Sequence, residues 1–173
     1  LIEHKDIQKK LYNELSTVFK DNKIKLKNLT KCPYFRAYIQ EVLRLALPVP
    51  NGVPRWTTKD IPITFTNKYT NKKESYVVPK NSIVSSSMLS INSMDKDKWG
   101  NNPNEINLNN WLINDDNGNI LFRKKHDIYP FSIGMRNCVG MSLALRLINM
   151  ILGTMILKYE FNNIDNKPFK VET

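Results

Sequence analysis

The chain has only two cysteines and two histidines among its 173 residues. No C-x-x-C pair is present, and a four-ligand zinc site would need all four of these side chains at a spacing that matches no recognised motif. Two cysteines are also too few for the disulfide framework of a small secreted domain. This scarcity, together with the lack of a signal-peptide pattern in the first residues, favours an intracellular, reducing setting.

Arginine is scarce although the chain is strongly basic. The formal net charge is +10, but Lys outnumbers Arg by 20 to 6. Base readout and bidentate phosphate contacts favour arginine, and the basic residues here are scattered. The composition argues against nucleic-acid binding and leaves an acidic membrane or an acidic protein as a partner. Against this lysine background the six arginines are the informative cations.

The chain lacks an uninterrupted apolar run of membrane-spanning length. Its most apolar stretch, at 139–157, contains Arg146 and Asn149. This pattern predicts a buried helix and no transmembrane segment in the chain.

Two amphipathic segments in the N-terminal third predict helices. Apolar residues recur at helical spacing from Ile7 to Val18. A second helix is expected from Pro33 to Leu47, because proline suits the first helical position and Pro48 cannot continue the helix. With the apolar stretch near the C-terminus, these segments predict a mainly α chain.

Short strand-like runs complete an α+β fold class with small β-sheets. They lie at 61–65, 75–79 and 82–86, and a closing strand is expected at 158–161. The stretch 92–128 is polar and shows little periodicity. A segment of this length inside a compact domain is usually functional or is held by another part of the fold.

Glu41 and Arg44 form an unusual charged pair in the second predicted helix. Their i,i+3 spacing places them on one face. An exposed pair would contribute only a few tenths of a kcal/mol. The apolar residues around them also allow a buried pair, in which losing one partner costs roughly 3–5 kcal/mol. The helix alone leaves both interpretations open.

Cys138 lies in a loop between two glycines, directly ahead of the apolar stretch. Four interpretations compete. A structural thiol is the commonest fate of a lone cysteine, but this loop offers no hydrophobic surroundings. A nucleophile would need His126 as its base and has no G-x-S-x-G elbow around it. A redox sensor would have no resolving thiol nearby, and the fourth interpretation is a thiolate metal ligand.

The thiolate-ligand interpretation accounts for most features of the loop together. A helix beginning near Val139 directs its N-terminal amides at Cys138, and Arg136 adds positive charge, so both favour the thiolate. Gly134 and Gly140 leave room for a large flat ligand to approach the backbone. One thiolate without a second protein ligand suits heme, because the porphyrin supplies four nitrogens.

The segment FSIGMRNCVG at 131–140 resembles the heme-binding signature of the cytochrome P-450 family. It fits F-x-x-G-x-R-x-C-x-G at every fixed position: Phe131, Gly134, Arg136, Cys138 and Gly140. The resemblance covers essentially the whole chain and implies a C-terminal portion of that fold, a partial domain over residues 1–173.

Three further segments carry the same resemblance. Glu41 and Arg44 resemble the E-x-x-R pair of the family. The stretch at 53–60 resembles the one whose arginine contacts a heme propionate, which implies that role for Arg55. The segment at 98–112 resembles the meander region.

The resemblance implies a role for each matching residue. Cys138 would be the proximal ligand of the iron of heme b (iron protoporphyrin IX), and its thiolate would favour O–O cleavage. Phe131 would pack against the porphyrin beside the sulfur. Arg136 and Arg55 would hold the heme propionates. Glu41 and Arg44 would lock the meander in place, which implies that the pair is buried.

The sequence departs from the family pattern in two places. The meander usually carries P-x-R followed by Phe or Trp, but here Leu108 replaces the proline and Asn110 replaces the arginine. An asparagine can hydrogen-bond Glu41 but carries no charge, which predicts a weaker lock. The distal-helix pattern A/G-G-x-D/E-T, the N-terminal part and the membrane anchor of relatives are also absent from the sequence.

The implied function is a monooxygenase that inserts one atom of O2 into a lipophilic substrate with electrons from a reductase. The substrate would contact the apolar loop Val49–Pro54, and the reductase would dock near Arg123, Lys124 and Lys125. Relatives are often anchored at the endoplasmic reticulum. The chain alone is expected to be inactive, and the alternative is a non-catalytic remnant or interaction module that binds no heme.

Overall fold

The computed structural model describes residues 1–124 and 127–163, so Lys125 and His126 lie outside the described residues. Four α-helices are present in this part of the chain: α1 (Lys5–Val18), α2 (Pro33–Leu45), α3 (Lys96–Trp99) and α4 (Met141–Lys158). Strands β1 (Arg55–Trp56), β2 (Ile61–Thr66), β3 (Lys73–Val78), β4 (Ile83–Val84), β5 (Leu112–Asn114) and β6 (Ile120–Phe122) form three antiparallel pairs. The predicted α+β fold class with small sheets is confirmed.

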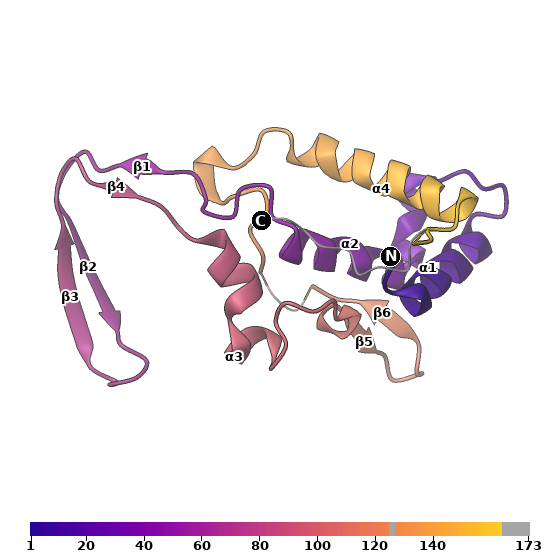
Figure 1. Ribbon diagram of the computed structural model, residues 1–173, viewed down its shortest axis with the longest axis horizontal. Coiled ribbons are helices and arrows are strands. Elements are labelled where there is room, and N and C mark those ends of the chain that lie inside the picture. The colour runs from indigo at the N-terminus through magenta and orange to yellow at the C-terminus, as the bar shows by residue number, and fades with distance from the viewer. Residues whose placement is uncertain (125–126, 164–173) are drawn as a thin grey trace.

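The core lies where α1, α2 and the C-terminal half of α4 meet. Leu11, Leu15 and Phe35 are fully buried, and Ile156 of α4 packs into the same cluster. Gly153 lets α4 approach closely, because a Cβ atom there would lie 3.0 Å from Cδ1 of Ile24. In Figure 1, α2 runs between α4 and the β5–β6 ribbon, which places α2 at the centre of the helical part.

Helix α2 begins as predicted and ends earlier than predicted. Pro33 occupies the first helical turn, and the carboxylate of Glu14 in α1 accepts the N–H groups of Tyr34 and Phe35 at 2.9 and 2.8 Å. The helix ends at Leu45 rather than Leu47, and Ala46 already has non-helical dihedral angles. The physical reason is Pro48: it disfavours helical geometry at Leu47, and in a continued helix its ring would clash with the carbonyl of Arg44.

The predicted strand-like runs form two separate pairs. Strands β2 and β3 make a hairpin in which Ile61 pairs with Val78 and Thr66 with Lys73. The run at 82–86 is reduced to β4, which pairs with β1. The hairpin extends away from the helices (Figure 1), and all six residues of β2 are exposed.

The prediction of a closing strand at 158–161 was wrong. Helix α4 continues to Lys158, and no strand follows it within the residues described. Instead, the N–H of Phe161 donates to the Gln8 side chain of α1 at 2.8 Å. A helix side chain therefore satisfies the backbone group that the prediction assigned to a sheet.

Helix α4 departs from the predicted buried helix. Of the residues of α4, only Gly153, Ile156 and Leu157 are buried. The apolar side chains of Leu143, Leu147, Met150 and Ile151 are exposed, and they recur at the i, i+4, i+7, i+8 spacing of one helix face. The C-terminal end of α4 packs into the core, while this apolar stripe is exposed.

Candidate functional site

Cys138 lies in a short loop at the N-terminal end of α4. The loop at 131–140 includes a one-turn 3-10 helix at Gly134–Arg136, and Gly140 is the N-cap of α4. The N–H of Cys138 donates to the carbonyl of Phe131 at 2.9 Å, which closes the loop on itself. The thiol is exposed, so the loop presents the sulfur to an external ligand at a helix N-terminus.

The backbone of this loop uses glycine at one position for a steric reason. Gly134 has φ +81°, in the left-handed region that residues with a Cβ rarely adopt. At Gly140 an added Cβ would lie 3.8 Å from Sγ of Cys138, an ordinary contact distance. The turn itself therefore accounts for Gly134, while Gly140 keeps the space beside the sulfur open.

The side chains around the sulfur are mostly apolar and exposed. Phe131 is half-buried, while Ile133, Met135 and Val139 are exposed, and Arg136 is the exposed cation of the loop. Together they form an apolar surface with one positive charge at its edge. Such a surface suits a flat apolar ligand that carries acidic groups.

Arg55 lies in β1, outside the cysteine loop. Its guanidinium is exposed and donates to the carbonyls of Val53 and Pro54, at 3.5 and 3.1 Å. Both acceptors belong to the loop that precedes β1. The described contacts do not link Arg55 to Cys138, Arg136 or Phe131.

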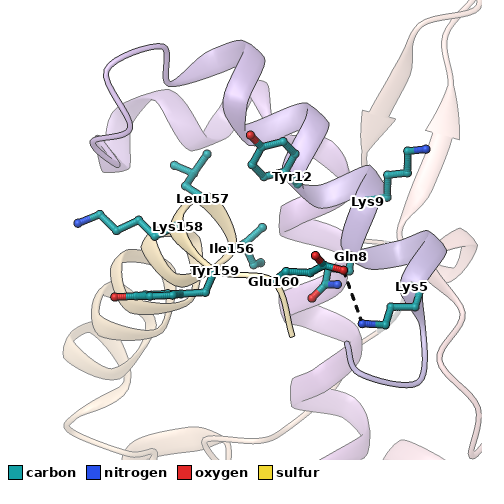
Figure 2. A pocket seen from close by; sticks show the side chains of 9 residues that line it. All are labelled: Lys5, Gln8, Lys9, Tyr12, Ile156, Leu157, Lys158, Tyr159 and Glu160. Carbon is teal, nitrogen blue, oxygen red and sulfur yellow. Dashed lines mark ion pairs between the residues drawn. The ribbon is translucent and has the colours of Figure 1, made fainter. Parts of the chain in front are cut away.

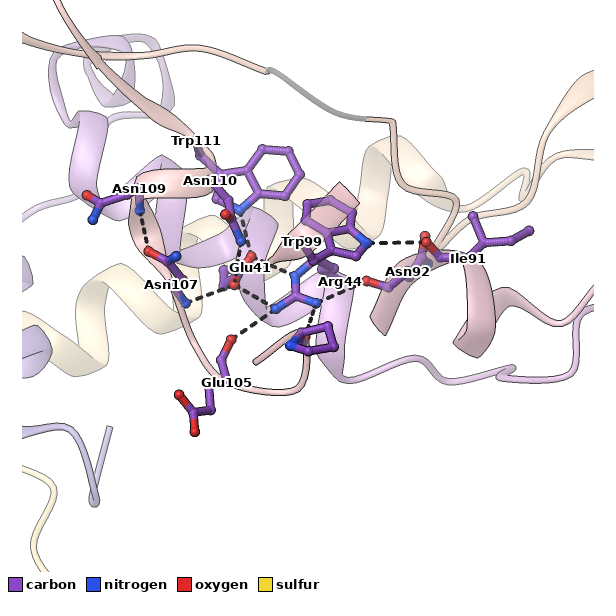
Figure 3. A network of polar contacts seen from close by, with 11 residues as sticks. Glu41, Arg44, Ile91, Asn92, Trp99, Glu105, Asn107, Asn109, Asn110 and Trp111 are labelled. Carbon is purple, nitrogen blue, oxygen red and sulfur yellow. Dashed lines mark hydrogen bonds and ion pairs between the residues drawn. The ribbon is translucent and has the colours of Figure 1, made fainter. Parts of the chain in front are cut away.

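Glu41 and Arg44 form a buried ion pair near the C-terminal end of α2 (Figure 3). Arg44 Nη2 lies 2.8 Å from Glu41 Oε1, and Nε lies 2.9 Å from Oε2, while both side chains are fully buried. The remaining N–H groups of Arg44 donate to the carbonyls of Asn92 and Glu105, each at 3.0 Å, and of Pro103. Every N–H group of the guanidinium therefore has a hydrogen-bond acceptor. Through these bonds the ion pair fixes the backbone at residues 92 and 103–105, which precede β5.

The ion pair has neighbours that the sequence analysis did not single out. Trp111 Nε1 donates to Glu41 Oε2 at 2.8 Å, and the backbone N–H of Asn107 donates to Oε1 at 2.9 Å. The ring of Trp99 lies 4.8 Å from the guanidinium carbon of Arg44. The aromatic position after Asn110 in the meander pattern was the available signal for Trp111, but its hydrogen bond depends on the fold.

Two of the three residues expected to face a reductase lie in the described chain. Arg123 and Lys124 are exposed, and Lys124 forms an ion pair with Asp127 at 3.1 Å. Lys125 lies outside the described residues. Asp127 reduces the positive charge of this segment, so Arg123 is the stronger cationic feature there.

The loop expected to contact substrate is exposed and sharply turned. Gly52 has φ +65°, and a Cβ there would clash with the carbonyl oxygen of Ser86. Val49 and Val53 are about half exposed. Gly52 therefore lets the loop pack against 85–86 while its apolar side chains remain accessible.

A separate groove lies at the other end of α4, where it meets α1 (Figure 2). It has a volume of about 500 Å³, with Tyr12 and three lysines around buried Ile156 and Leu157. Helix α4 has 18 residues, so its far end lies about 27 Å from the cysteine loop at 1.5 Å per residue. The groove is distinct from the Cys138 loop.

Comparison with known proteins decides the family. A model of the family described as Cytochrome P450 matches residues 1–173. The chain belongs to the cytochrome P450 family. It is 30% identical to "Probable cytochrome P450 508A2" of Dictyostelium discoideum, over 97% of this chain and 33% of that protein. It is 30% identical to "Cytochrome P450 2C28" of Mesocricetus auratus and 32% identical to "Cytochrome P450 71B31" of Arabidopsis thaliana, over 95% and 94% of this chain and 30% of each relative.

The chain spans about a third of the length of these cytochrome P450 relatives. Among the described residues, α4 is long and apolar enough to cross a membrane by length and composition, with 17% of it buried. Core helices of soluble proteins meet the same criterion, so this observation is weak evidence for a membrane span.

Proposed function

We propose that this chain forms the heme-ligand portion of a cytochrome P450 monooxygenase, a partial domain over residues 1–173. The whole enzyme would insert one atom of O2 into a lipophilic substrate with electrons from a reductase, in an intracellular setting. The observation that carries the proposal is the exposed Cys138 thiol, held in a self-closed loop at the N-terminus of α4. Family membership supplies the reaction class.

The donor set of the loop fits heme b. A single exposed cysteine sulfur lies among exposed apolar side chains, and Gly140 leaves the space beside it open. Cys138 would ligate the iron, Phe131 would pack on the porphyrin, and Arg136 and Arg55 would bind the propionates. Heme would supply the redox and oxygen-transfer chemistry of the reaction.

The residues of this chain would act around the sulfur ligand of that heme and at the substrate. The N-terminus of α4 and the side chain of Arg136 would bring positive charge to the loop that holds the sulfur ligand. The apolar side chains around the sulfur would exclude water from it. Glu41 and Arg44 would hold the meander in position, and the Val49–Pro54 loop would contact the substrate.

Two features support inactivity of the 173 residues by themselves. Within this sequence no acid–Thr pair of the distal-helix pattern is available to move a proton to bound dioxygen. The exposed apolar stripe of α4 would also leave the site poorly closed to water. The same stripe favours the alternative, an interaction module that binds no heme.

Reconstitution with hemin tests the ligand assignment directly. The reduced protein should give a red-shifted Soret band with CO, typical of thiolate ligation. Cys138→Ser should abolish this band, and the matched control Cys32→Ser should keep it. A band that survives Cys138→Ser, or no band in the unaltered chain, would contradict the assignment and favour the non-heme alternative.

A reductase assay in a polypeptide that includes a distal portion tests the docking proposal. Arg123→Glu with Lys124→Glu should slow the first electron transfer, more strongly at low salt, because electrostatic steering is screened by ions. Lys59→Glu with Lys72→Glu, near the β2–β3 hairpin, is the matched charge control. An equal effect of both pairs would remove this segment from the docking surface.

A further inference from the structure

The carboxylate of Glu41 is more fully bonded than a single ion pair requires. It accepts hydrogen bonds from Nε and Nη2 of Arg44, the N–H of Asn107, Nδ2 of Asn110 and Nε1 of Trp111. These five donor groups belong to four residues, of which Arg44 is the charged one. The network is therefore neutral overall, with one buried anion and one buried cation (Figure 3).

Trp111 and Asn110 contribute unequally to this network. The Trp111 indole N–H lies 2.8 Å from Oε2, and the Trp111 side chain is fully buried. The Asn110 amide lies 3.2 Å from Oε1 and is only half-buried. The shorter bond in the more buried place is the stronger one, because a low local dielectric strengthens hydrogen bonds to a charge.

We infer that Trp111 completes the Glu41–Arg44 lock as a positioning residue, in a network that has Asn110 where a second cation would stand. Its N–H orients the Glu41 carboxylate, and the carboxylate in turn orients the guanidinium of Arg44. Trp111 is rigid and packs against Trp99 with ring centroids 5.9 Å apart. The hydrogen bond from Trp111 compensates for the missing positive charge at Asn110, so the lock does not need an arginine at that position.

Trp111 acts through Arg44 on the backbone at residues 92 and 103–105. The guanidinium binds the carbonyl of Asn92 and, from a second segment, those of Pro103 and Glu105. Without the Trp111 donor, Oε2 of Glu41 keeps only its bond from Nε of Arg44, so the carboxylate is less tightly oriented and Arg44 loses part of its alignment with these carbonyls. The inference rests on these contacts alone and does not depend on heme binding.

Trp111→Phe tests the inference, because phenylalanine keeps an aromatic ring and removes the N–H. The equilibrium constant for folding, from urea unfolding of the 173-residue chain, should fall about tenfold to a hundredfold, the range for a hydrogen bond to a charged group. Trp56→Phe, at an exposed tryptophan, is the matched control and should change the constant less than threefold.

Asn110→Arg distinguishes a lost donor from lost packing. In the unaltered chain this substitution should change stability little, because the lock is already neutral. In the Trp111→Phe background it should restore most of the lost stability, and the restored part should weaken with added salt. No loss in Trp111→Phe, or a loss that Asn110→Arg does not restore, would overturn the inference.

Discussion

The two thiols of this protein lie in opposite environments. Cys32, at the N-cap of α2, is fully buried, and its burial, with a smaller contribution from the negative charge of Glu14, raises the pKa of its thiol to about 12. Cys138 is exposed at the start of α4. Only the thiolate reacts with alkylating reagents, and only an accessible sulfur meets them.

Iodoacetamide at pH 8 should therefore modify Cys138 and leave Cys32 unmodified in the folded chain. Peptide mass mapping after a short exposure measures both sites. Unfolding in guanidinium chloride should make both cysteines react, which serves as the control. Labelling of Cys32 in the native protein would contradict the burial described for α2.

Asn92 is the clearest unfavourable residue in the structure. Its side chain is fully buried, and neither the oxygen nor the nitrogen of the side-chain amide has a hydrogen-bond partner among the described residues. The backbone carbonyl of Asn92, by contrast, accepts a hydrogen bond from Arg44. A buried amide without partners costs about 1–3 kcal/mol. The backbone of Asn92 serves the Glu41–Arg44 lock, but its side chain does not.

Asn92→Leu should raise the free energy of unfolding by about 1–2 kcal/mol, because leucine has a similar size and no unsatisfied polar atoms. Urea unfolding measures the change. Asn101→Leu, at an exposed position, is the matched control and should have almost no effect. A destabilised Asn92→Leu variant would mean that the amide has a partner such as a bound water.

At the scale of secondary-structure elements, α1 caps α2 through Glu14. Burial raises the pKa of the Glu14 carboxyl above its ordinary value of 4.5, and its bonds to the N–H groups of Tyr34 and Phe35 oppose that rise in part. A raised folded-state pKa means that the native state binds the proton more tightly than the unfolded state does. The stability from this group is complete below about pH 4.5 and is lost as pH rises through the folded-state pKa.

Comparison with Glu14→Gln isolates this pH dependence, because glutamine does not titrate. The free energy of unfolding of the unaltered chain minus that of the variant should decrease as pH rises from 4.5 to 7. Urea titrations at closely spaced pH values measure the difference. A difference that increases with pH would show that the two N–H bonds outweigh the burial of the charge.

At the scale of the whole molecule, helix α4 presents a stripe of exposed apolar side chains. Leu143, Leu147, Met150 and Ile151 lie exposed on the helix that carries the cysteine loop at its N-terminus. The chain spans about a third of its relatives, and its described residues leave this stripe without a covering layer. A contiguous apolar surface of this kind binds other apolar surfaces.

The isolated chain should therefore bind an apolar fluorescent dye and self-associate as its concentration rises. Leu147→Lys with Ile151→Lys should lower both the dye fluorescence and the association measured by sedimentation, while far-ultraviolet circular dichroism stays unchanged. Tyr69→Lys, at an exposed aromatic on the β2–β3 turn, is the control. Equal dye binding by the Leu147→Lys/Ile151→Lys variant and the Tyr69→Lys control would mean that the dye binds an apolar surface other than the α4 stripe.

The sequence by itself determined the family and the local elements of this protein. The pattern at 131–140 contains its fixed residues within ten positions, so it can be recognised without a fold. Helices α1 and α2 followed from apolar periodicity and from two prolines, which act on their immediate neighbours. The strands of the β2–β3 hairpin were predicted as two short runs, and their pairing with each other was shown by the structure. Each of these predictions depends on interactions between residues close in sequence.

Only the tertiary structure decided which distant residues meet. The burial of Glu41 and Arg44 was left open by the helix alone, and the donors from Asn107 and Trp111 come from 66 and 70 residues away. The closing strand failed because Gln8, from the opposite end of the chain, satisfies the backbone of Phe161. The exposure of α4 likewise depends on what packs against it. Contacts of this kind are set by the geometry of packing, which local sequence patterns do not encode.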